Sequence, residues 1–117
     1  MEEMRVGIML MSGVDDGMLL GFDTTNDEGS QDGDAWILSV GRKEDNDVCL
    51  RNDTFSSRYH AKIHWRGRRW WLEDCESKNG TFIEDDADDA RVSGTIPLEY
   101  GQLFRVGRTW IRIQAAD

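Results

Sequence analysis

The chain has 117 residues, with 23 Asp and Glu against 14 Lys and Arg, which gives a formal charge of -9. This balance argues against a nucleic-acid binder, whose affinity comes largely from basic contacts to phosphates, and against a polybasic membrane anchor. The length predicts a single domain over residues 1–117, with a core large enough to need neither a disulfide nor a metal ion.

Short apolar stretches separated by Gly, Asp, Asn and Ser recur along the chain and predict strands. In chain order, the expected strands are 5–11, 18–22, 36–40, 61–65, 70–73, 81–83, 102–106 and 110–114. Alternation is clear where Ala61, Ile63 and Trp65 fall on one face of a strand and the polar residues between them fall on the other. Many short strands of this kind predict an all-β sandwich or barrel with mainly antiparallel strands.

The segments between these strands are typical of turns and loops. Residues 66–69 fit the tip of a hairpin, and composition marks 24–34 and 84–90 as loops. Pro97, the lone proline, is expected just before a short strand, where it does least harm to a sheet.

The few cysteines and histidines limit which metal sites and disulfides the chain can form. Cys49 and Cys75 are far apart, and His60 and His64 are the only histidines, so we expect no metal site and no cofactor. Reduced thiols in a cytosolic protein are the simpler interpretation, and a disulfide is the alternative. The longest apolar run near the N-terminus, 8–11, is too short for a signal peptide or a membrane span, so we expect a soluble cytoplasmic chain.

Charge is distributed unevenly along the chain. Residues 41–81 hold nine basic and seven acidic side chains, a balance of +2. The remaining residues hold five basic and sixteen acidic ones, a balance of -11. This asymmetry predicts one face suited to a small anion on an otherwise acidic surface.

Three polar clusters lie in the predicted loops, where binding residues are usually found. They are Gly41-Arg42, the run Ser-Ser-Arg-Tyr-His at 56–60, and the run Glu-Ser-Lys-Asn-Gly-Thr at 76–81. With a closing Leu-x-x-Gly-Gln-x-Phe-x-Val-Gly at 98–107, their order and spacing resemble the forkhead-associated (FHA) domain, over roughly residues 6–114. The resemblance implies a two-sheet antiparallel β-sandwich with binding loops at one end. It also implies a non-enzymatic module that binds proteins marked on threonine by a Ser/Thr kinase.

The resemblance assigns roles to individual residues. Arg42 would bind the phosphate and the Ser57 hydroxyl would hold it, since a planar guanidinium suits paired phosphate oxygens. Asn79 would clamp the ligand backbone, with Lys78 and Arg58 as further contacts.

Other residues would support this site. By resemblance, Gly41, His60, Gly80 and Thr81 shape the loops and take no part in chemistry. Phe55 precedes the two serines and suggests an apolar preference at the third ligand residue after the phosphothreonine. An acidic stretch at 84–89 replaces a second Asn-Gly turn found in many family members, which leaves ligand selectivity open.

Three alternatives compete with this interpretation. Ser57 and His60 could suggest a hydrolase, but the Gly-x-Ser-x-Gly elbow is missing. The acidic runs 27–34 and 84–89 could suggest calcium ligands, although neither has the EF-hand pattern. A phosphate-independent scaffold or oligomerisation domain is the main alternative; it would be favoured by tryptophans exposed on one sheet face, for which the candidates are Trp36, Trp65, Trp70 and Trp110.

Overall fold

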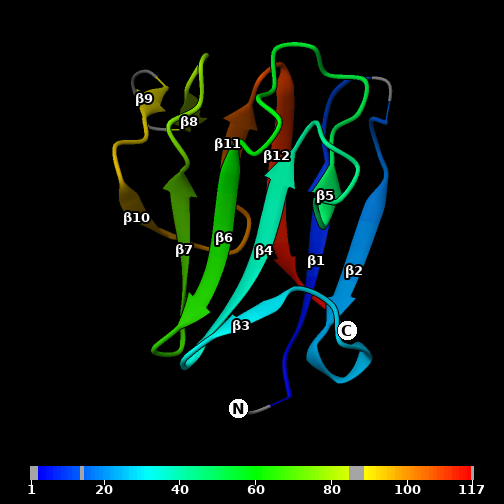
Figure 1. Ribbon diagram of the computed structural model, residues 1–117, viewed down its shortest axis with the longest axis vertical. Coiled ribbons are helices and arrows are strands. Elements are labelled where there is room, and N and C mark those ends of the chain that lie inside the picture. The colour runs from blue at the N-terminus through cyan, green and yellow to red at the C-terminus, as the bar shows by residue number, and fades with distance from the viewer. Residues whose placement is uncertain (1–2, 14, 85–88, 117) are drawn as a thin grey trace.

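The computed structural model describes residues 3–13, 15–84 and 89–116, which form two sheets packed face to face (Figure 1). Sheet A contains, in spatial order, β2 (Leu19–Asp23), β1 (Arg5–Leu10), β12 (Thr109–Ala115), β11 (Leu103–Val106), β8 (Thr81–Ile83) and β9 (Ala90–Arg91). Sheet B contains β10 (Thr95–Leu98), β7 (Arg69–Asp74), β6 (Ala61–Arg66), β4 (Ala35–Gly41) and β3 (Ser30–Asp32), with β5 (Val48–Cys49) paired to β4. A 3-10 helix, η1 (Thr24–Asn26), follows β2. All strand pairs are antiparallel except β4 with β5.

The core lies between the sheets and follows the period-two alternation of the sequence. In sheet A, Val6, Ile8 and Leu10 of β1 point inward and are buried. In sheet B, the inward residues of β4 include Trp36 and Leu38, which are buried as well. The prediction of an all-β sandwich is confirmed. It succeeded because the alternation of apolar and polar residues determines which face of each strand is buried.

All the predicted strands are present, with each end within one residue of its expected place. The sequence missed β3, β5, β9 and β10, because they are short or lack an alternating apolar face. The loop predicted over 24–34 was therefore wrong in part, since it contains η1 and β3. Pro97 lies inside β10 instead of before it, which is tolerated because β10 is an edge strand. Of the loop expected over 84–90, residues 85–88 lie outside the described residues, and Ala90 begins β9.

The tryptophans do not form an exposed platform. Trp36 and Trp70 are buried in the core, with ring centroids 6.0 Å apart. Trp65 packs against Trp70 at 5.1 Å and is only partly exposed, as is Trp110. The two most buried rings therefore support the core and are not available to a partner protein.

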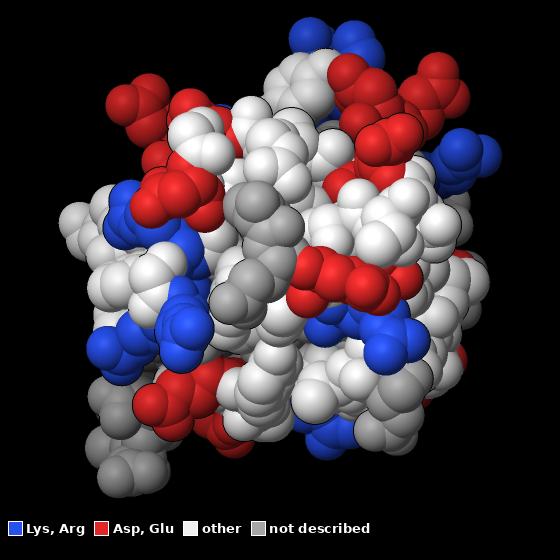
Figure 2. All heavy atoms as spheres, turned by 90° about the horizontal axis from the view of Figure 1, so that it is seen from below, with Lys and Arg blue, Asp and Glu red and all other residues white. Residues whose placement is uncertain are grey.

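The two ends of the sandwich differ. At one end lie the segments after β4, before β6, after β7 and between β11 and β12, whereas both chain termini lie at the other end (Figure 1). The predicted hairpin at 66–69 is confirmed, with Gly67 and Arg68 both at φ 60°. Seen from the terminus end, carboxylates are spread over the surface and the basic residues stand in separate groups (Figure 2). Among the described residues, no helix is long and apolar enough to cross a membrane.

Candidate functional site

Gly41 ends β4 at a point where two backbones nearly touch. A Cβ atom at this position would overlap the carbonyl oxygen of Arg58 and lie 2.9 Å from Nδ2 of Asn46. The same Arg58 carbonyl accepts hydrogen bonds from the Lys43 N–H at 3.2 Å and from Asn46 Nδ2 at 2.7 Å. Only glycine fits this contact, which fixes the 42–46 turn against the 56–60 loop.

Arg42 follows immediately and is held by the neighbouring loop. Its backbone N–H donates to the Ser57 carbonyl at 3.0 Å, and its side-chain Nε donates to the Ser56 carbonyl at 3.1 Å. The side chain is exposed, and its two terminal nitrogens donate to none of the described residues. The guanidinium is therefore oriented by Nε while the ends of its fork remain open to a ligand.

His60 is fully buried and ties the loops together. Its Nδ1 accepts the Ser57 N–H at 2.9 Å, and its Nε2 lies 2.9 Å from the Gly80 carbonyl, which can only accept. These two partners require the neutral tautomer protonated at Nε2. Burial lowers the pKa of His60 below its usual 6.5, in keeping with that state. Both ring nitrogens are thus occupied by backbone groups, and neither bonds the Ser57 hydroxyl as a hydrolase base would.

Two further hydrogen bonds join the 52–60 loop to the 75–80 turn. The Lys78 N–H donates to the Ser57 Oγ at 3.0 Å, and the Asn79 Nδ2 donates to the Phe55 carbonyl at 2.9 Å. Because the Ser57 oxygen already accepts from Lys78, its own proton can be directed outward as a donor. The Asn79 amide keeps its carbonyl oxygen and one N–H for a ligand.

The 75–80 turn is shaped from beneath by Asp74, a residue that the sequence did not single out. Its Oδ1 accepts from the Ser77 hydroxyl at 2.5 Å and from the Thr81 hydroxyl at 2.8 Å. Gly80 adopts φ 84°, a left-handed conformation that glycine takes without strain. These contacts explain why Gly80 and the fully buried Thr81 accompany Asn79.

Asp53 is a second residue that the sequence analysis missed. Its carboxylate accepts from the Phe55 N–H at 3.0 Å, the Arg108 N–H at 2.8 Å and the Thr109 hydroxyl at 2.7 Å. It therefore fastens the 52–57 loop to the turn between β11 and β12. The local signal was available, because an Asp two residues before an exposed N–H is typical of an Asx turn, but its link to β12 is non-local.

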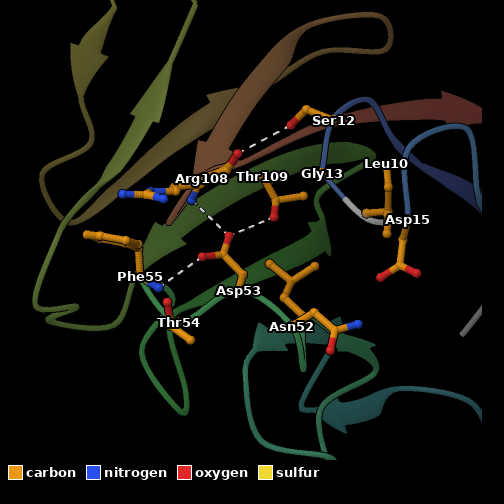
Figure 3. Close-up of a pocket in the computed structure, with 11 residues that line it drawn as sticks. Leu10, Ser12, Gly13, Asp15, Asn52, Asp53, Thr54, Phe55, Arg108 and Thr109 are labelled. Atoms are coloured by element: carbon orange, nitrogen blue, oxygen red, sulfur yellow. Dashed lines mark hydrogen bonds between the residues drawn. The ribbon is translucent and has the colours of Figure 1, made fainter.

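A pocket of about 170 Å³ opens beside Asp53 (Figure 3). It lies between the β1–β2 turn, the 52–55 loop and the β11–β12 turn, and its lining includes Leu10, Leu50 and Phe55. The guanidinium of Arg108 stacks over the Phe55 ring, 3.7 Å from its centroid. A hollow lined by these apolar side chains, and also by Asp15, Asp53 and Arg108, thus lies next to Phe55, whose carbonyl holds Asn79.

The structure brings Arg42, Ser57, Lys78 and Asn79 together through the hydrogen bonds above. Arg58 joins them through its carbonyl, and its side chain is exposed on the same loop. Among the described residues, no carboxylate forms an ion pair within 4.0 Å of the side chains of Arg42, Arg58 or Lys78. The cations of the loop cluster are therefore not neutralised by a described carboxylate, which suits them to an anion.

No metal site is formed by the described residues. They contain no group of three or more His, Cys, Asp or Glu side chains placed to hold an ion, and this includes the acidic run 27–34. The other run considered for calcium, 84–89, lies largely outside the described residues. Cys49 and Cys75 are not joined by a disulfide, and burial raises the pKa of Cys75, which makes that thiol a poor nucleophile.

A sequence model of the FHA domain matches residues 38–107. FhaB proteins of Mycobacterium tuberculosis and Mycolicibacterium smegmatis, described as FHA domain-containing, are each 35% identical over 75 residues, or 64% of this chain. The match covers 45% of their own length, so this chain corresponds to less than half of those relatives.

Solved structures agree with the fold. One, from a structural and functional analysis of phosphothreonine-dependent FHA domain interactions, is 27% identical, with a TM-score of 0.71 and coverage of 97% of this chain and 98% of that one. The FHA domain of FhaA, solved in complex with the intracellular domain of another protein, is 28% identical, with a TM-score of 0.67 and coverage of 93% and 99%. The FHA domain of CT664 from Chlamydia trachomatis, at 23% identity, a TM-score of 0.73 and coverage of 97% and 99%, supports the fold alone.

Proposed function

Because this chain belongs to the FHA domain family, we propose that it binds proteins phosphorylated on threonine, using the loop end of the sandwich. The observation that carries the proposal is the arrangement of Arg42, Ser57 and Asn79, which three separate loops bring together with unused donors. A related structure comes from work on phosphothreonine-dependent interactions, which supports the same ligand class. The module is non-enzymatic and needs no cofactor, because it recognises its ligand without changing it.

The phosphate would be held by groups that are already positioned. A phosphothreonine carries about -1.5 to -2 charges near neutral pH and three strong acceptor oxygens. The terminal nitrogens of Arg42 supply a planar pair of donors, and the Ser57 hydroxyl supplies a third. Arg58 and Lys78 add positive charge on the adjoining loops, which offsets part of the opposing field of a chain with charge -9.

The ligand backbone would be read by Asn79. Its side chain is fixed through Nδ2 to the Phe55 carbonyl, so the remaining amide groups face the ligand without first losing rotamer freedom. This placement makes Asn79 a second anchor beside the phosphate.

The adjoining pocket would set a sequence preference. We propose that an apolar side chain at the third residue after the phosphothreonine enters the hollow bounded by Leu10, Leu50 and Phe55. A peptide library that strictly preferred Asp or Glu at this position would contradict the apolar assignment and point to the Arg108 guanidinium instead.

The test is calorimetric titration with three matched peptides carrying phosphothreonine, phosphoserine or plain threonine. We expect measurable affinity for the phosphothreonine peptide only. Arg42→Ala should weaken binding by at least about tenfold, because hydrogen bonds to charged groups contribute about 1.5–3 kcal/mol each. Arg66→Ala, in the hairpin at the far end, is the matched control and should leave binding unchanged. Equal weak binding of all three peptides, unaffected by Arg42→Ala, would refute the proposal.

The partner is then a protein marked by a Ser/Thr kinase, with no role for nucleic acid or membrane. We propose that the domain recognises a phosphorylated segment of that partner and that it does so in the cytoplasm.

A further inference from the structure

Five strands of the described residues pair on one side only, and all but β2 are poor templates for pairing; one of these, β5, has two residues. β9 has two residues, β3 has three, and β10 contains Pro97, whose nitrogen cannot donate a hydrogen bond. β2 is different, because it has five residues and contains neither proline nor lysine. Natural edge strands usually carry one of these blocking features.

The free edge of β2 exposes backbone groups. Thr24 N–H donates to the Met4 carbonyl, and Leu10 N–H donates to the Met18 carbonyl. The backbone N–H and C=O groups of the even-numbered residues in and beside β2 therefore point toward β1. Alternation of hydrogen bonds along an antiparallel strand directs the N–H and C=O of Leu19 and Gly21 away from β1. No other described residue forms a backbone hydrogen bond with either group.

Side chains along this edge leave room for a second chain. Leu19 is 53% exposed and Met18 is 46% exposed, although both are large and apolar. No atom lies within 4 Å of the position that a Cβ would occupy at Gly21. A glycine on an open edge allows another backbone to approach closely, and Leu19 and Met18 offer apolar contacts beside it.

We propose that β2 is a docking edge for an extended segment of a partner protein, which adds a strand to sheet A. The charges near the edge indicate what charge the partner segment should carry. Asp15 and Asp16 precede β2, Asp23 ends it and Asp27 follows η1, whereas Arg5 is the one basic residue paired in register with β2. An apolar strand flanked by Lys or Arg complements this local negative charge.

A second copy of this chain fits the edge poorly. Antiparallel pairing of β2 with itself would bring the acidic residues at its two ends opposite those of the other copy. Each copy also carries a charge of -9, which opposes association. The docking edge is therefore assigned to a different, basic partner. It lies on the side of the sandwich, away from Arg42, Ser57 and Asn79, although the β1–β2 turn that precedes it also lines the pocket beside Asp53.

The test uses a defined probe and residue-level detection. The probe is acetyl-Lys-Lys-Val-Thr-Val-Thr-Val-Lys-Lys-amide, and its control has Glu in place of every Lys. Nitrogen-15 spectra of the full chain should show shifts in Leu19 and Gly21, with slower amide exchange at both, for the basic peptide only. Arg42→Ala should bind the probe as the unmodified chain does.

Two variants test the edge directly. Gly21→Pro removes an outward N–H without breaking a bond to β1, and affinity should fall by about fivefold or more, as expected for one lost hydrogen bond. If that variant does not fold, Leu19→Lys replaces an apolar contact by a repelling charge and should cause a similar loss. Leu103→Lys, on the outer face of the same sheet away from the edge, is the control. Shifts confined to the loop cluster, equal binding of the glutamate peptide, unchanged binding by a folded edge variant, or a β2-mediated homodimer in light scattering would overturn the proposal.

Discussion

Replacing Gly41 with alanine is the sharpest single perturbation of the loop cluster. The new methyl group would overlap the Arg58 carbonyl, so that carbonyl must move. Moving it disrupts two hydrogen bonds, from Lys43 and Asn46, at about 1 kcal/mol each. Overpacking in a rigid site adds about 1–3 kcal/mol. The free energy of unfolding should therefore fall by about 3–5 kcal/mol in total.

Urea titration would measure this change, and thermal melting should show a midpoint lower by about 10 °C or more for a domain of this size. Gly21→Ala is a matched control, because its methyl group meets no atom within 4 Å, and it should change stability by less than about 0.5 kcal/mol. Phosphopeptide affinity should fall in Gly41→Ala alone, since the same shift displaces Arg42. A Gly41→Ala variant as stable as the control would show that the loop yields freely and would refute the close-packing argument.

Three further outcomes follow from the loop contacts. Burial lowers the pKa of His60 below 6.5, so the unfolded chain takes up a proton at this residue before the folded chain does. Stability present above pH 6.5 should therefore be lost as pH falls from there toward the pKa of the folded state, in acid titrations followed by circular dichroism. Asp53→Asn leaves one acceptor oxygen for three donors, so the free energy of unfolding measured by urea titration should fall by about 2 kcal/mol. An unchanged urea midpoint would show that Asp53 does not stabilise the contact between the 52–57 loop and β12. Arg42→Lys keeps the charge but loses the fork and the Nε contact, so calorimetry should show about tenfold weaker phosphopeptide binding, whereas full affinity would mean that charge alone suffices beside Ser57.

Sequence patterns predicted the sandwich because its strands alternate between apolar and polar residues over enough length to be recognised. Ala61, Ile63 and Trp65 already define one face of β6. The pattern failed at β3, whose three residues are all polar and exposed, because pairing with β4 alone makes it a strand. Short partners on sheet edges are set by tertiary contacts that no local signal contains.

The candidate site was predictable to a similar degree. Arg42, Ser57 and Asn79 were identified from motif order, and the hydrogen bonds between their loops now give each a fixed neighbour. Asp74 was not identified because an acidic residue in an acidic chain has no distinguishing pattern, and Asp53 was not identified because a local Asx-turn signal does not reveal its link to β12. Their partners, Thr109 and Thr81, lie on strands that are reached only after folding.

The placement of both chain ends opposite the loop cluster has a consequence for valency (Figure 1). A domain attached to a surface near Ala116 would present Arg42 and Asn79 outward, so coupling for a binding assay need not obstruct them. Two such domains joined tail to tail would face in opposite directions. They would crosslink phosphorylated sites on separate molecules more readily than they would share neighbouring sites on one, because the linker cannot bring both recognition ends to the same side without being long.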